Sequence, residues 1–175
     1  MIVLGIDPGT AITGYGVVCT DADSGLAKSV HGAPRLIECG VIRTSPRAEL
    51  ASRLQDIFEG VTELIERHKP DALAVEDVFF ARNVRTTVVL GHARGVVLLA
   101  GARAGVTIHE YAPALIKKTV VGRGAATKEQ VQFMVARLLR LKTAPQPADA
   151  ADGVACALTC VMSAGTAALR LRIAG

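Results

Sequence analysis

The stretch GIDPGTAITGYGVV, residues 5–18, places an aspartate at the end of an apolar run and then breaks the run with Pro-Gly. The run before it, MIVLGI, has the composition of a buried strand, and GYGVVCT (14–20) has that of a second strand. The turn around PGTAITG makes them an antiparallel pair. A buried strand that ends in a carboxylate allows two interpretations: Asp7 is solvated in the turn, or it is held at the edge of the sheet as a ligand.

The rest of the chain predicts a mixed sheet covered by helices. RLIECGVIRT (35–44) alternates as a third strand, and the apolar spacing of AELASRLQDIFEGVTELIERHK (48–69) predicts a helix that Pro70 ends. We expect further strands over 72–76 and 106–110, and further helices over 82–104, 113–121, 127–140 and 149–171. This order is typical of an α/β fold, with a five-stranded mixed sheet flanked by helices. A length of 175 residues predicts a single domain, 1–175.

The composition argues against several other classes of protein. No uncharged run approaches the roughly 18 residues that span a bilayer, and the start, MIVLGID, lacks the basic region of a signal peptide. We therefore expect a soluble, cytoplasmic protein with no membrane partner. The four cysteines form no CxxC pair and are expected as buried free thiols, and the scattered histidines do not have the spacing of a zinc site.

The charge of the chain is unevenly distributed. Between Val78 and Ala148 there are eleven basic residues against two acids, although the net charge of the whole chain is only +4. A solvated basic face is one explanation, but a polyanionic partner accounts better for so uneven a segment.

Four acidic residues are candidates for a shared site. Asp7 and Glu76 end two predicted strands, and parallel neighbouring strands would bring both to the carboxyl edge of the sheet. Asp149 and Asp152 share one face of the last helix, where Asp149 could also act only as an N-cap. Asp77 would point to the opposite side of its strand and is left out. Converging carboxylates would repel one another by on the order of 15 kcal/mol, so they would need protons or bound cations.

All-oxygen ligands favour Mg²⁺ or Mn²⁺, and two such ions could activate a water and stabilise the leaving oxygen of a phosphodiester. Asp7 would then be a metal ligand, bridging both ions. We expect Gly9, Gly14 and Gly16 either to form a tight hairpin or to adopt positive φ and leave room for a nucleic-acid backbone.

Four segments carry a resemblance to a known family: GIDPGTAITGYGVV, AVEDVFFARN, IKKTVVGRGAATKEQV and PQPADAADGVACALT. In order, and covering residues 2 to about 162, they resemble the RuvC family of bacterial Holliday-junction resolvases. The resemblance implies an RNase H-like fold and a homodimer that nicks two opposed strands of a four-way DNA junction with Mg²⁺ or Mn²⁺, two ions per subunit. It also implies RuvA and RuvB, the branch-migration proteins, as partners.

The resemblance assigns roles to particular residues. Its catalytic, metal-binding acids fall on Asp7, Glu76, Asp149 and Asp152. Its junction-stacking aromatic falls on Phe79, and its functional lysines fall on Lys117 and Lys128. From the basic segment we add three candidate DNA contacts: Arg82, Lys118 and Arg123. The loop over 20–35 is longer than the family pattern and the final helix ends in LRLRIAG, so neither is given a role.

The predicted helix over 83–104 carries apolar residues around much of its circumference. The sheet can cover only one side of it, so a second subunit is expected to cover another.

Three alternative functions stay open at the level of sequence. An actin-type ATPase or kinase shares the Asp-x-Gly-Thr turn but needs a second lobe and a second phosphate turn. A non-catalytic junction-binding module would not need four acids. A related RNase H-like nuclease acting on RNA differs only in its substrate.

Overall fold

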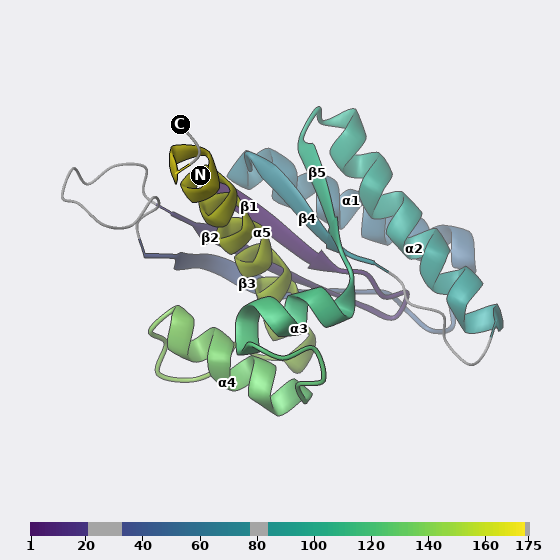
Figure 1. The fold of residues 1–175 in the computed structure, drawn as a ribbon. Helices are drawn as coiled ribbons and strands as arrows, with labels where there is room; N and C mark the ends of the chain where they lie inside the picture. The colour runs from purple at the N-terminus through teal and green to yellow at the C-terminus, as the bar shows by residue number, and fades with distance from the viewer. Residues whose placement is uncertain (21–32, 78–83, 174–175) are drawn as a thin grey trace.

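A computed structural model describes residues 1–20, 33–77 and 84–173. The described strands form one five-stranded sheet in the order β3-β2-β1-β4-β5 (Figure 1). The strands are β1 (Ile2–Asp7), β2 (Ile12–Cys19), β3 (Arg35–Arg43), β4 (Ala72–Glu76) and β5 (Thr107–Tyr111). The β1–β2 and β2–β3 pairs are antiparallel, whereas β4 runs parallel to both β1 and β5. The predicted mixed sheet is therefore confirmed.

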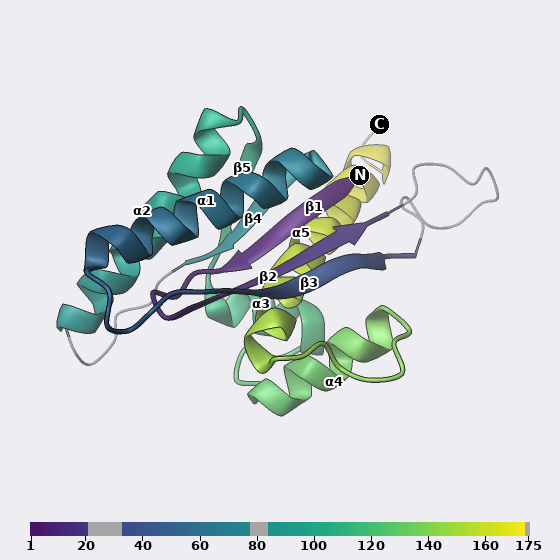
Figure 2. The same ribbon diagram turned by 180° about the vertical axis from the view of Figure 1, so that it is seen from behind.

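Helices cover both faces of the sheet, as Figures 1 and 2 show from opposite sides. One layer contains α1 (Leu50–His68) and α2 (Val84–Arg103). The other contains α5 (Ala148–Ile173), with α3 (Pro113–Val121) and α4 (Lys128–Leu138) packed against it. These bounds lie within a few residues of those expected from the sequence, except that the first residues of the helix predicted over 82–104 are outside the described part.

The alternation of side chains divides the core between these two layers. In β1, Leu4 and Ile6 face α1 and α2, whereas Val3 belongs to the cluster beneath α5. Because side chains in a strand alternate between the faces of the sheet, Asp7 lies on the α5 face together with Val3. In β4, Ala72 and Ala74 also lie on the α5 face, so the same alternation puts Glu76 there.

Gly9 fits the tight-hairpin alternative, because a Cβ there would lie 2.2 Å from the carbonyl oxygen of Ile12, whereas Gly14 and Gly16 have a role that was not expected. None of Gly9, Gly14 and Gly16 has a positive φ. A Cβ on Gly14 would lie 1.9 Å from the carbonyl oxygen of Asp149, and one on Gly16 would lie 2.3 Å from Val154 Cγ2. The expectation of positive φ was wrong, because these two glycines let α5 pack directly on the backbone of β2.

The same close contact occurs on β1 and from the side of the helix. A Cβ on Gly5 would lie 2.3 Å from the carbonyl oxygen of Gly153, and one on Gly153 would lie 2.6 Å from Tyr15 Cα. The first turns of α5 are therefore held against the strands that carry the carboxylate edge.

Local sequence explains where several helices begin and end. At the start of α4, the Thr127 side chain accepts a hydrogen bond from the backbone N–H of Gln130, whose side chain accepts one from the N–H of Thr127. Pro113 occupies the first turn of α3, and Gly122 ends that helix with a φ of 92°.

The cysteines and the polarity of the helices bear on two expectations from composition. All four cysteines are free; Cys19, Cys156 and Cys160 are buried, whereas Cys39 is only partly so. In the described ranges, no helix combines the length and apolar character that crossing a membrane requires.

Candidate active site

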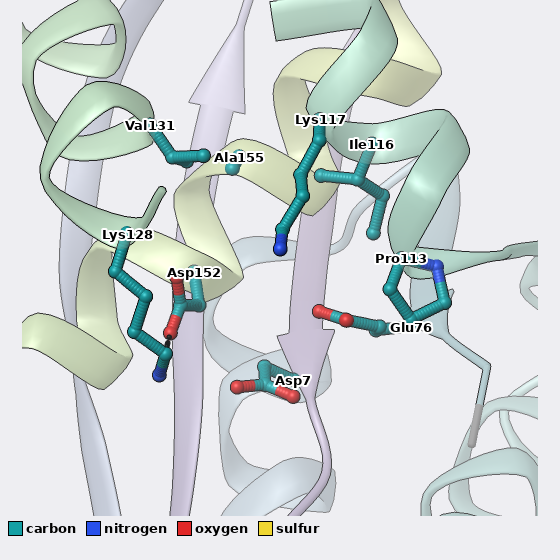
Figure 3. Close-up of a pocket in the computed structure, with 9 residues that line it drawn as sticks. All are labelled: Asp7, Glu76, Pro113, Ile116, Lys117, Lys128, Val131, Asp152 and Ala155. Carbon is teal, nitrogen blue, oxygen red and sulfur yellow. Dashed lines mark hydrogen bonds and ion pairs between the residues drawn. The ribbon is translucent and has the colours of Figure 1, made fainter. Parts of the chain in front are cut away.

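Asp7 and Glu76 lie at the carboxyl edge of two adjacent parallel strands. Ile6 is in register with Val75, so the next residue of each strand brings a carboxylate to the same edge and the same face. Figure 3 shows both side chains in one pocket, beneath the ends of α3 and α4. Parallel pairing thus produces the convergence that the sequence predicted.

The first turns of α5 bring two further acids to the same place. One carboxylate oxygen from each of Asp7, Asp149 and Asp152 can be chosen so that all three lie within 4.8 Å of one another. Asp149 lies inside α5, which begins at Ala148, so it is not the N-cap of this helix. The alternative interpretation of Asp149 as a cap is therefore wrong.

The pocket is a cavity of about 280 Å³. Its acidic floor contains Asp7, Glu76 and Asp152, and Asp149 adjoins it through the cluster with Asp7. The sequence had not identified several residues that line its walls: Pro113, Ile116, Val131 and Ala155. The sequence could have predicted Pro113 as a pocket residue, because it comes just after β5, and β5 ends at the same edge of the sheet as β4.

Burial and crowding make this set of acids electrostatically unfavourable. The pKa of Asp7 is raised from 3.8 to about 7, mainly by burial and also by the charges of Asp152 and Asp149, against the opposing charge of Lys128. Burial also raises the pKa of Glu76 from 4.5 to about 8, with the charge of Asp7 as the next cause. Carboxylates with pKa values near neutral either hold protons or require a cation. The donor set therefore fits a hard divalent metal ion, which would hold the acids ionised.

Two lysines face the acids from the helices above. Lys128 donates a hydrogen bond from Nζ to Asp152 Oδ2 at 3.0 Å. Lys117 lines the pocket, and its charge lowers the pKa of Glu76. Both lysines chosen through the family resemblance are thus at the site.

The other proposed DNA contacts are placed differently. Lys118 is exposed on α3 and does not line the pocket. Arg123 is also exposed, and it donates a hydrogen bond to Gln130 Oε1 at the start of α4. Phe79 and Arg82 lie outside the described residues.

Comparison with known proteins identifies the family. The model of the family described as "Crossover junction endodeoxyribonuclease RuvC" matches residues 3–160. The chain belongs to the RuvC family. A RuvC from Heliobacterium modesticaldum is 47% identical over 163 residues, which cover 93% of this chain and 95% of that protein.

Solved RuvC structures have the same fold as this chain. RuvC from Thermus thermophilus superposes with a TM-score of 0.82 at 39% identity, covering 94% of this chain and 95% of that one. The same protein in complex with a Holliday junction substrate gives a TM-score of 0.81 at 36% identity, with the same coverage of both chains. The five-stranded mixed sheet with its helices is therefore the RNase H-like fold of RuvC, as the sequence predicted.

Proposed function

We propose that this chain is a structure-selective endonuclease that resolves four-way DNA junctions in recombination and repair by paired, symmetric nicks. The observation that carries the proposal is the convergence of Asp7, Glu76 and Asp152 on one pocket of a RuvC-family fold, with Asp149 beside Asp7 and Asp152. The whole of 1–175 would act as one nuclease domain.

The four acids, Asp7 among them, would hold Mg²⁺ or Mn²⁺, with two ions per subunit. Such ions supply an activated water and stabilise the leaving oxygen in phosphodiester hydrolysis. The chain's contribution is to keep the acids in a buried, rigid arrangement. Asp7 and Glu76 are fixed by parallel strands, and Asp149 and Asp152 by a helix that contacts the strand backbone.

The lysines would bind the DNA backbone beside the cut. Lys117 and Lys128 extend from α3 and α4 toward the acids (Figure 3), so a phosphate above the pocket could contact both. Lys118, exposed on α3, and Arg123, exposed in the loop between α3 and α4, would extend this basic surface along a DNA arm. Phe79 follows Glu76 by three residues, and we propose that it stacks on a base at the junction centre, with Arg82 nearby.

A homodimer would place one such site at each of two opposed DNA strands of the junction. The outward stripe of α2 consists of Val84, Val88, Gly91, Gly95 and Leu99, and it lies opposite the buried Ala93, Val97 and Ala100. Val84 is 76% exposed and Val88 and Leu99 are each 53% exposed, whereas a Cβ on either glycine would meet nothing within 4 Å. This stripe could receive the same helix of a second copy. RuvA and RuvB would be its partners on chromosomal DNA, which would place the protein in the cytoplasm.

Cleavage of matched substrates tests the function. The purified protein with Mg²⁺ is given a four-way DNA junction, duplex DNA and RNA of the same sequence, with Asp7→Asn as the control for a contaminating nuclease. We expect symmetric nicks in the junction only, and none with the variant. Equal cutting of all three substrates would reject the resolvase assignment, and ATP turnover would revive the actin-type alternative.

A further inference from the structure

Arg94 of α2 joins the ends of two strands directly behind the carboxylate edge. Its Nη2 lies 3.2 Å from Asp77 Oδ1 and also donates a hydrogen bond to Glu110 Oε2. Asp77 is the residue after Glu76, and Glu110 lies in β5. The Nε of Arg94 is buried and has no hydrogen-bond partner within the described part of the chain.

The side chains held by Arg94 are on the opposite face of the sheet from the pocket. Ile108 of β5 packs in the core beneath α1 and α2, and alternation puts Glu110 on that same face. Alternation likewise turns Asp77 toward α2 and Glu76 toward α5. Arg94 therefore contacts the neighbour of a site residue from behind, without entering the pocket.

The backbone transmits this contact to Glu76. The N–H of Asp77 donates a hydrogen bond to the carbonyl oxygen of Tyr111 at 2.9 Å, and Glu76 itself is in register with Tyr111. The β4–β5 pairing thus continues one residue beyond Glu76. A fixed Asp77 side chain would help to keep this last pairing closed, and the backbone direction at this pairing sets where the Glu76 side chain points.

The contribution of Arg94 to overall stability is small. The side chains of Arg94, Asp77 and Glu110 are 24%, 49% and 44% exposed, and ion pairs at such exposure are weak. Without the guanidinium, however, the carboxylates of Asp77 and Glu110 would lose the cation that bridges them. The main effect of its loss would therefore be local, at the end of β4.

We propose that Arg94 is a positioning residue: by bridging Asp77 and Glu110 it fixes the end of β4 and so aims the Glu76 carboxylate at the metal site. This inference rests on the proposed function of Glu76 as a ligand. Loss of a group that hydrogen-bonds a metal ligand directly commonly lowers metal affinity or activity by about 10- to 100-fold. Arg94 acts on Glu76 through the neighbouring Asp77, so we expect an effect at the lower end of that range.

Arg94→Gln tests the inference, with Arg94→Lys and Glu110→Gln as milder changes. Three quantities are measured: the Mn²⁺ concentration at half of the metal-induced rise in Tm without DNA, the single-turnover rate of junction cleavage, and junction affinity in Ca²⁺. Arg67→Gln is the matched control. Arg67 lies in the last turn of α1, near the start of β4, and its Nη2 is 3.4 Å from Oε1 of Glu38 in β3. The control therefore also removes an arginine that pairs with a carboxylate, but at the opposite end of β4 from Glu76.

For Arg94→Gln we expect the half-saturating Mn²⁺ to rise and the cleavage rate to fall by about tenfold or more, with junction affinity within about twofold of wild type. Arg94→Lys should recover part of both losses, and Arg67→Gln should change neither. Metal response and rate within twofold of wild type in both Arg94→Gln and Glu110→Gln would overturn the inference. So would an equal loss in Arg67→Gln, which would indicate general destabilisation.

Failure of the proposed function would give a different result. If the wild-type protein gains stability from Mn²⁺ but cuts no junction, the resolvase assignment fails. The metal titration of Arg94→Gln, which needs no DNA, would still decide whether Arg94 positions Glu76.

Discussion

Lys128 Nζ lies 3.0 Å from Asp152 Oδ2, so that the first turn of α4 is joined to α5 within the lining of the pocket (Figure 3). The charge of Lys128 lowers the pKa values of Asp7 and Glu76, in opposition to burial. In the metal-free protein this lysine therefore partly supplies the positive charge that the acids require.

Replacing Lys128 by methionine should make the protein depend more strongly on metal ions. Without the ammonium group, the pKa values of Asp7 and Glu76 should rise further, and the ammonium of Lys128 no longer competes with the metal ion for Asp152. We expect a larger rise in Tm on adding Mg²⁺ than in the wild type, together with cleavage slowed by about tenfold or more through the lost phosphate contact. Lys142→Met, which removes an exposed lysine outside the pocket, is the control. An unchanged metal response would contradict the proposed competition.

Asp7→Asn should stabilise the metal-free protein while abolishing its activity. Each unit by which the pKa of a buried acid is raised corresponds to about 1.4 kcal/mol against its ionised form. At a pH above 8, removing this charge should raise the metal-free Tm by about 3 °C or more. The variant should gain less stability from Mg²⁺ and should not cut junctions. A lower metal-free Tm, measured by calorimetry with a chelator present, would show that the carboxylate is not under electrostatic strain.

The stability of the metal-free protein should fall as pH rises from about 4 to about 8. In this window the folded chain keeps protons on Asp7 and Glu76 that the unfolded chain has already released, because both pKa values are raised on folding. The pKa of Glu38 is lowered on folding, because its hydrogen bonds with Tyr15 and His68 outweigh the effect of burial. Glu38 therefore adds stability above its unfolded pKa, and this stability is lost only as pH falls through its folded pKa.

Mg²⁺ should reduce this dependence, since it holds the carboxylates ionised. The difference in Tm with and without Mg²⁺ should therefore grow with pH, and Glu76→Gln should flatten the metal-free profile. A difference in Tm that is constant across the pH range would contradict the assignment of these acids to a metal site.

Gly14→Ala should move α5 away from β2 and damage the site. The new methyl group would lie 1.9 Å from the carbonyl oxygen of Asp149, and a backbone atom cannot move aside as a flexible side chain can. We expect a loss of about 1 to 3 kcal/mol in unfolding free energy and a weaker response to Mg²⁺. Gly60→Ala is the matched control, because the atoms nearest to its methyl group would be side-chain atoms of Ile42, which can shift. Equal metal responses in the two variants would argue against a positioning role for Gly14.

Val88→Asp should convert the proposed dimer to a monomer. The side chain is 53% exposed on the outward stripe of α2, where a charge would be buried against a second copy. Sedimentation equilibrium should show the loss of association, and nicking of the two strands should become independent. Phe133→Asp is the control, because Phe133 is 62% exposed on α4, outside that stripe. A wild-type protein that is monomeric at micromolar concentration would contradict the dimer itself.

Sequence patterns predicted most of the fold because they act over short distances. Strand alternation and helical spacing located the elements, and the parallel pairing of β1 with β4 was enough to bring Asp7 and Glu76 together. The role of the glycines was missed, because whether a glycine opens a surface or admits a helix depends on which element packs above it.

The contacts among Asp77, Arg94 and Glu110, behind the site, also could not be predicted from the sequence. Asp77 was set aside because it points away from Glu76, and alternation supports that direction. What strand alternation could not reveal is that Arg94, seventeen positions later, and Glu110 meet it there. Such a contact depends on the packing of α2 against β4 and β5, which no local pattern encodes.

The direct contact of α5 with the strand backbone also bears on how this enzyme could be re-engineered. Asp7, Glu76, Asp149 and Asp152 all belong to elements joined through main-chain atoms or strand pairing. The lysines above them are carried by α3 and α4, which pack on α5 through side chains. Under the proposed function, the hydrolytic acids and the DNA-binding lysines would belong to different structural elements that meet at the Lys128–Asp152 hydrogen bond. Changes on α3 and α4 that keep Lys128 would then be a way to alter DNA binding without moving the acids.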